Sequence, residues 1–172
     1  MTDFFLGIDL GTSGARLCVV DGSGQSIFFN RAPEVETVSI KAGYHEQQPE
    51  DWWQSVTGLI NSIPGDVRQH ICCISVDGTS GTALLCDPDG NPTSPALLYN
   101  DNRAVNEAET IRHLAPDSTG AQGTGSSLAK ILWLLNHGYS GRYALHQADW
   151  ISGNLCQSWQ YSDTNLSLIH IS

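Results

Sequence analysis

The sequence predicts an α/β fold that opens with a three-stranded antiparallel meander inside a mixed sheet. Three short apolar runs near the N-terminus, residues 4–8, 17–20 and 27–30, are separated by glycine-containing turns. Helical spacing of apolar residues begins only after Pro49. Because short strands joined by tight turns usually pair with their neighbours, we expect the meander to precede the first helix.

The turn between the first two runs carries the residues best suited to binding phosphate. Gly11 and Gly14 permit positive φ and close backbone approach. Successive N–H groups in such a turn form an anion-binding concavity, to which Thr12 and Ser13 add hydroxyl groups. Asp9 leaves the strand end as a carboxylate, which suits a hydrated Mg²⁺. The residue types alone leave an ordinary glycine-rich hairpin as the alternative.

A helix is predicted to begin at Pro49, because proline is favoured at the first helical position and Glu50 and Asp51 suit the first turn. Pro64 and Gly65 end it. Its apolar side chains keep helical spacing and are expected to pack in the core; they are Trp52, Val56, Leu59, Ile60 and Ile63.

A second small-residue turn, residues 77–82, joins the apolar strands predicted at 71–76 and 83–86. Thr79 and Ser80 leave room for a sugar and offer both donors and acceptors, so this turn is the best candidate for a polyol contact. A tight turn without a ligand is the alternative.

Two helices are predicted in the following segment. The first carries apolar residues from Val105 to Leu114 and ends at Pro116, and the second is capped at Ser126 and ends near Gly138. On the second helix, Lys130 is interpreted as a solvated or carbonyl-binding side chain. Before the first, Asp101 is interpreted either as a helix cap or as a brace for a substrate loop.

The net charge of −10 and the pI of about 4.7 argue against nucleic acid and anionic membranes as main partners. No apolar run reaches the roughly 20 residues of a membrane-spanning helix, and no basic region precedes the first strand, so a cytoplasmic location is expected. The five cysteines are expected to be free thiols, with the first four buried in strand-like runs. The histidines lack zinc-ligand spacing.

The segment Gly7–Arg16, GIDLGTSGAR, resembles the first phosphate loop of the actin/hexokinase/chaperone ATPase superfamily, and in particular the opening of the FGGY carbohydrate kinases. Further motifs of that family follow in the same order, and the resemblance covers about residues 4–165. They are EQQPEDWW at 46–53, DGTSGT at 77–82, YNDNRA at 99–104, AKILWL at 129–134, ADW at 148–150 and SDTN at 162–165. The resemblance implies a ribonuclease-H-like domain of which this chain is the N-terminal part.

The resemblance also implies ATP and Mg²⁺ as cofactors and a sugar as substrate. Asp9 would position the phosphoryl group and hold Mg²⁺ through water, and the ATP phosphates would lie on Gly11, Thr12 and Ser13. The sugar would be bound by residues from two later motifs, namely Asp77, Thr79, Ser80 and Asp101. Within the family, the motif combination resembles the D-ribulose kinases of plants and cyanobacteria, some of which are labelled xylulose kinases. The expected substrate is therefore D-ribulose or D-xylulose.

The C-terminal residues depart from the family pattern. Residues 1–165 are expected to form an incomplete first kinase domain, and residues 166–172, LSLIHIS, are expected to be a non-native tail. The catalytic-base aspartate of the family follows a later motif, so the chain alone is expected to be inactive. Two other functions stay open: an actin-like or chaperone-like ATP-binding module without a sugar substrate, and a noncatalytic fragment.

Overall fold

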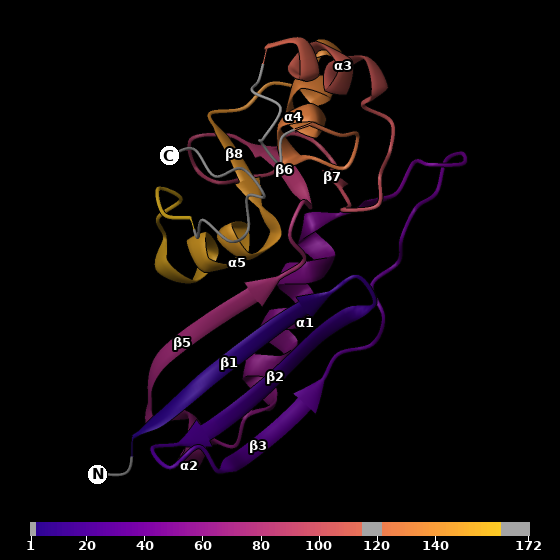
Figure 1. Cartoon of the computed structure of the whole chain (residues 1–172). Coiled ribbons are helices and arrows are strands. Elements are labelled where there is room, and N and C mark those ends of the chain that lie inside the picture. The colour runs from indigo at the N-terminus through magenta and orange to yellow at the C-terminus, as the bar shows by residue number, and fades with distance from the viewer. Residues whose placement is uncertain (1–2, 115–121, 163–172) are drawn as a thin grey trace. The chain divides into compact units, whose positions relative to one another are not determined.

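The structure is a computed structural model that describes residues 3–114 and 122–162 (Figure 1). The chain divides into two compact units, each described here by itself. The first unit contains Met1–Glu36 and Glu50–Gly78, and the second contains Thr37–Pro49 and Thr79–Ser172. The expected helix end at Pro116, the segment 163–165 and the tail 166–172 lie outside the described residues. Across the described ranges, no helix combines the length and the apolar character needed to cross a bilayer.

The first unit contains a four-stranded mixed sheet in the order β3-β2-β1-β5. Strands β1 (Phe4–Gly11), β2 (Gly14–Asp21) and β3 (Ser26–Arg31) form the predicted antiparallel meander, and β5 (Ile71–Gly78) pairs parallel with β1. The predicted fold class, an α/β chain with a mixed sheet that opens with this meander, is therefore confirmed.

One face of this sheet is buried. The buried side chains alternate along β1 and β2, as expected for a strand pair with one covered face. Helix α1 (Pro49–Ser62) lies behind the sheet in Figure 1, and a 2.9 Å hydrogen bond from Asn30 Nδ2 to Ser62 Oγ joins its end to β3. The core comprises Leu6, Ile8, Leu10, Leu17, Val19, Trp52, Val56 and Leu59. The short helix α2 (Gly65–Arg68) then leads into β5.

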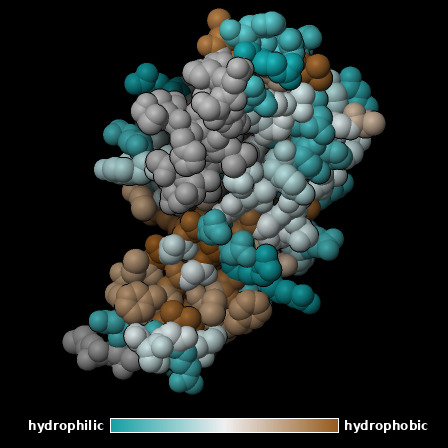
Figure 2. All heavy atoms as spheres, in the orientation of Figure 1, coloured by the Kyte–Doolittle hydropathy of each residue, from teal (hydrophilic) through white to brown (hydrophobic). Residues whose placement is uncertain are grey.

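The opposite face of the sheet carries apolar side chains in contact with solvent. Phe5 is 40% exposed and Phe29 is 60% exposed, and Figure 2 shows hydrophobic residues gathered over this part of the chain. The prediction of buried cysteines is wrong for Cys72 and Cys73, which are exposed. The reason is that β5 is an edge strand of the sheet in the part of the chain that the structure describes, so its apolar run has one unpaired edge and an open face there.

The second unit contains an antiparallel sheet in the order β4-β7-β6-β8. Its strands are β4 (Glu46–Gln47), β7 (Ala96–Leu97), β6 (Ala83–Cys86) and β8 (Tyr143–His146), and only β6 is predicted by an apolar run. Three helices accompany it: α3 (Val105–Leu114), α4 (Ser127–Asn136) and α5 (Gln147–Cys156). Leu134 of α4 packs against Leu85 and Leu97 of the sheet, and α3 packs on α4.

The helix starts of the second unit follow the local sequence. The Ser126 hydroxyl accepts a hydrogen bond from the N–H of Ala129 at 3.1 Å, which confirms the predicted cap of α4. The Asp149 carboxylate accepts the N–H of His146 at 3.2 Å and so closes a capping box at the start of α5.

Candidate functional site

The first candidate site is the two-residue turn between β1 and β2. Gly11 and Gly14 face each other across the hairpin, and Thr12 and Ser13 form its tip. Gly14 has φ +133°, and a Cβ atom there would lie 2.9 Å from the carbonyl oxygen of Pro33. Only glycine fits this position without strain, so the close approach of the turn to the chain after β3 depends on it.

Four charged residues form a row across the sheet next to this turn. Asp9 pairs with Arg16 on β2 and with Asp77 on β5, and Arg16 pairs with Arg31 on β3. Residues paired in neighbouring strands project from the same face of a sheet. The row therefore runs Arg31, Arg16, Asp9, Asp77, with two cations at one end and two carboxylates at the other.

The central pair of this row is an ion pair. Arg16 Nη2 lies 2.8 Å from Asp9 Oδ2, and the two side chains are 57% and 49% exposed. Because solvent screens such a pair, it holds the two side chains in place at little gain in stability. Both groups stay accessible to a charged ligand.

Two hollows flank Arg16 in the first unit. One, of about 370 Å³, is lined by Ser13, Arg16, Arg31 and Glu34 among others, so a hydroxyl and two guanidinium groups that suit an anion stand beside one carboxylate. The other, of about 440 Å³, is lined by Asp9, Asp77, Arg16 and Phe29 among others. The first hollow can accept phosphate oxygens, and the second offers two carboxylates.

The carboxylates fit a hydrated magnesium ion better than a fully protein-bound metal. Among the described residues, no three His, Cys, Asp or Glu side chains converge on one point. Mg²⁺ in phosphate sites keeps several waters and uses one or two carboxylates. Asp9, with Asp77 beside it in the sheet, meets that requirement.

The second candidate site is the turn after β5, which belongs to the second unit from Thr79 onward. The N–H of Thr79 donates to Oε1 of the buried Gln147 at 3.0 Å, and the buried Thr82 Oγ1 accepts the N–H of Tyr99 at 3.2 Å. Gly81 has φ +78°. The predicted sugar-binding residues Thr79 and Ser80 therefore lie on a turn that is fixed on both sides, and both are partly exposed.

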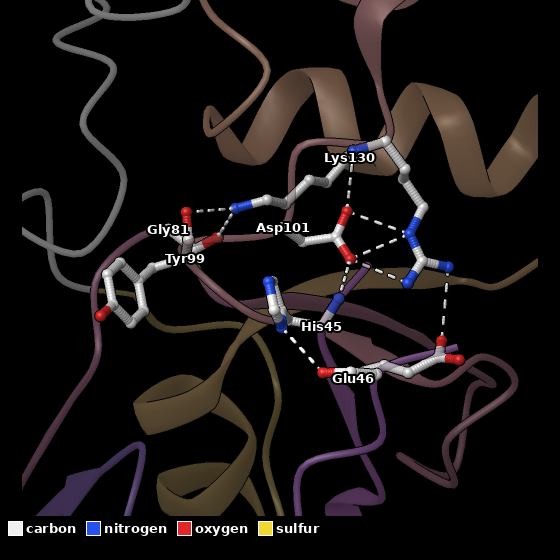
Figure 3. A network of polar contacts seen from close by, with 8 residues as sticks. His45, Glu46, Gly81, Tyr99, Asp101 and Lys130 are labelled. Carbon is white, nitrogen blue, oxygen red and sulfur yellow. Dashed lines mark hydrogen bonds and ion pairs between the residues drawn. The ribbon is translucent and has the colours of Figure 1, made fainter. Parts of the chain in front are cut away.

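Asp101 lies in a buried polar network (Figure 3). Its carboxylate, which is fully buried, accepts hydrogen bonds from Arg103 Nε and Nη2 at 2.8–3.0 Å and from the N–H of His45 at 2.7 Å. Arg103 Nη1 also lies 3.4 Å from Glu46 Oε2, and its guanidinium stacks on the rings of Tyr44 and Trp133. These contacts are those of a brace that joins the 99–103 loop to β4.

The structure distributes the predicted site residues between the two units. Those predicted to bind phosphate and metal belong to the first unit together with Asp77, whereas Thr79, Ser80 and Asp101 belong to the second.

The sequence analysis missed Arg16 and Arg31. Counting back from the two-residue turn would have placed Arg16 opposite Asp9, but the bulge in the β2–β3 pairing hides the position of Arg31.

Comparison with known proteins places these residues in a family. The profile of the N-terminal domain of the FGGY family of carbohydrate kinases matches residues 4–165. The xylulose kinase of Staphylococcus xylosus is 31% identical over 141 residues, which cover 78% of this chain and 29% of that protein. The glycerol kinase of Beutenbergia cavernae is 29% identical over 164 residues, which cover 90% and 32%.

Solved structures agree on the fold. A sugar kinase structure from Brucella ovis, described as a xyloylose kinase, superposes with a TM-score of 0.78 at 23% identity and covers 87% of this chain and 34% of that one. The chain spans less than a third of the length of the two curated relatives described above. The resemblance seen in the sequence motifs to this kinase family and its actin/hexokinase-like fold is thus confirmed.

Proposed function

Because this chain belongs to the FGGY family of carbohydrate kinases, we propose that it supplies the N-terminal part of an enzyme that transfers a phosphoryl group from ATP to a ketopentose. The observation that carries the proposal is the Asp9–Arg16 pair beside the glycine turn, next to a hollow whose lining contains two arginines and a serine hydroxyl together with one glutamate. Such a site binds phosphate and places a carboxylate within reach of a metal ion without using lysine.

The turn and the charged row provide the phosphate end of the reaction. The backbone N–H groups of Gly11, Thr12 and Ser13 donate hydrogen bonds to phosphate oxygens. The guanidinium groups of Arg16 and Arg31 offset the negative charge of the phosphates. Asp9 would hold Mg²⁺ through water, and the ion would supply further neutralisation of the charge on the phosphates. Positioning and charge neutralisation then supply most of the catalysis, as is general for phosphoryl transfer.

The sugar end of the reaction uses the second turn. Thr79 and Ser80 donate to and accept from sugar hydroxyls, with Asp77 at the end of β5 as a further acceptor. Asp101 contributes by holding the neighbouring loop. The attacking sugar oxygen bonds to the γ-phosphorus, the bond to the bridging oxygen of ADP breaks, and the hydroxyl proton passes to a carboxylate. We propose that this base is an aspartate outside the chain.

The substrate we propose is D-ribulose or D-xylulose. The motif combination favours D-ribulose, and the similarity to the Staphylococcus xylosus enzyme favours D-xylulose. The similarity to a glycerol kinase makes glycerol the competing substrate against which the two ketopentoses are compared. The partners are then small molecules, ATP and a sugar, and the location proposed is the cytoplasm, where ATP and pentoses meet.

The test is a measurement of sugar-dependent ADP release. The gene is sequenced across codon 165 and beyond, and both the whole protein that it encodes and the 172-residue chain are purified. The whole protein is expected to release ADP with D-ribulose or D-xylulose and far more slowly with glycerol, whereas the chain alone is expected to be inactive. A rate of ADP release that does not change when sugars are added would favour an ATPase module. A genuine stop after Ser172 would favour a noncatalytic fragment.

A further inference from the structure

Lys130 of α4 is a buried cation held by three backbone carbonyl groups. Its side chain has no exposed surface. Its Nζ donates to the carbonyl oxygens of Gly81 at 2.7 Å, Gly125 at 2.8 Å and Tyr99 at 3.2 Å. Figure 3 shows the ammonium group pointing at the carbonyls of Gly81 and Tyr99. The sequence alone left it open whether this lysine is solvated or binds carbonyls. The contacts show that it binds carbonyls.

Three carbonyl acceptors match the three donors of an ammonium group, so the buried charge is fully hydrogen-bonded. Burial nevertheless lowers the pKa of Lys130 to about 8, and the negative charge of Asp101 acts in the opposite direction. The lysine therefore stays charged at neutral pH, at a cost in desolvation. An apolar side chain would fill the same space without that cost but would take the donors away from the three carbonyls, which points to a role of the lysine in holding them.

The three carbonyls belong to three separate loops of the second unit. Gly81 lies in the turn that carries Thr79 and Ser80, Tyr99 lies in the loop that leads to Asp101, and Gly125 precedes the cap of α4. Lys130 is thus the point at which these loops are joined. The sugar-binding turn has no regular strand pairing of its own from residue 79 to 82, so such contacts fix its backbone.

We propose that Lys130 is a positioning residue for the sugar site: by binding the carbonyls of Gly81 and Tyr99, it sets where Thr79 and Ser80 stand relative to the sugar. This inference rests on the proposed function and assigns the sugar site a support that does not touch the substrate. Lys130 works together with Gln147, which accepts the N–H of Thr79, and with Thr82, which accepts the N–H of Tyr99.

The experiment compares Lys130→Met and Lys130→Arg with the matched control Lys41→Met in the whole protein. Lys41 is the other lysine of the chain. It is exposed and lies in the same unit as Lys130. Methionine is an unbranched side chain one heavy atom shorter than lysine, and it lacks the lysine donors. Arginine keeps the charge, but its planar fork cannot direct donors to three carbonyls around one atom. Hydrogen exchange of the amides at 79–82 is measured without ligand, and KM is measured separately for sugar and for ATP.

For Lys130→Met we expect about tenfold faster exchange at 79–82 and about a tenfold rise in the KM for sugar, while the KM for ATP changes less than about twofold. Lys130→Arg is expected to change both quantities in the same direction and to fold even if the methionine variant does not. Lys41→Met is expected to match the wild type.

Unchanged exchange at 79–82 in the Lys130 variants would overturn the proposal. So would an equal rise of both KM values, or a lower melting temperature with both KM values unchanged, because these results describe a purely structural lysine. If the protein phosphorylates no sugar, the proposed function fails. The exchange measurement then still decides whether Lys130 fixes the turn.

Discussion

Asp9 and Arg16 face each other across the first hairpin, and their side chains form a 2.8 Å ion pair at the base of the turn that joins β1 and β2. Under the proposed function, the pair brings a guanidinium group and a carboxylate to the place where the ATP phosphates would bind. The row to which the pair belongs holds two arginines and two aspartates, so it carries no net charge, whereas the whole chain is acidic.

Under the proposed function, replacing Asp9 by alanine in the whole protein is expected to lower kcat by about a hundredfold or more, because the carboxylate that would position the metal ion is lost. The exposed Asp3→Ala variant is the matched control and should keep wild-type turnover. Since the Asp9–Arg16 pair is half exposed, circular dichroism should show an intact fold. Near-normal kcat in Asp9→Ala would remove this residue from the mechanism.

Under the proposed function, Arg16→Ala is expected to raise the KM for ATP by about tenfold and to lower kcat, because a guanidinium that would face the phosphates is lost. Arg16→Lys keeps the charge but not the bidentate geometry, so its loss should be partial. Steady-state kinetics measure the change in KM and kcat. The reference variant is Arg68→Ala, because Arg68 is an exposed arginine on α2. An unchanged KM for ATP in Arg16→Ala would contradict the role.

Gly14→Ala is expected to destabilise the chain by about 1–3 kcal/mol, because φ +133° is unfavourable for alanine and its Cβ would lie 2.9 Å from the Pro33 carbonyl oxygen. Gly22→Ala is the control, since a Cβ there meets nothing within 4 Å. Urea denaturation of both variants gives the comparison. Equal stability of the two variants would mean that the turn tolerates a side chain.

Asp101→Asn is expected to cost about 3–5 kcal/mol, because it leaves the buried Arg103 without its charged partner. The exposed pair of Arg112 and Glu109 offers a contrast, and Glu109→Gln should cost less than about 1 kcal/mol. Denaturant melts at neutral pH distinguish the two. A small effect in Asp101→Asn would show that Glu46 alone satisfies Arg103.

The buried Lys130 predicts a pH dependence of stability. Its pKa of about 8 in the folded chain lies below the ordinary value of 10.5, so between these values the unfolded chain binds the extra proton. Stability should therefore rise with pH from about 8 to about 10.5 relative to Lys130→Met, by at most about 1.4 kcal/mol per pH unit. Denaturant melts between pH 7 and pH 10 measure this difference, and parallel pH profiles of the two proteins would contradict it.

The sequence by itself determined the local elements and the family. The two-residue turn between Gly11 and Gly14 fixes the first hairpin. The proline and acidic residues fix the start of α1, and Ser126 fixes the start of α4. Each of these features depends only on neighbours in the chain. The ordered motifs were sufficient to identify the kinase family and its fold.

Only the tertiary structure decided which distant residues meet. It placed Lys130 on the carbonyls of Gly81 and Tyr99, paired Arg103 with Glu46, and left Cys72 on an open strand of the sheet. Periodicity shows which residues share a face of one element, but it does not show which element covers that face. Burial and ion pairing are properties of contacts between segments far apart in the chain, so they follow from the packing of the fold.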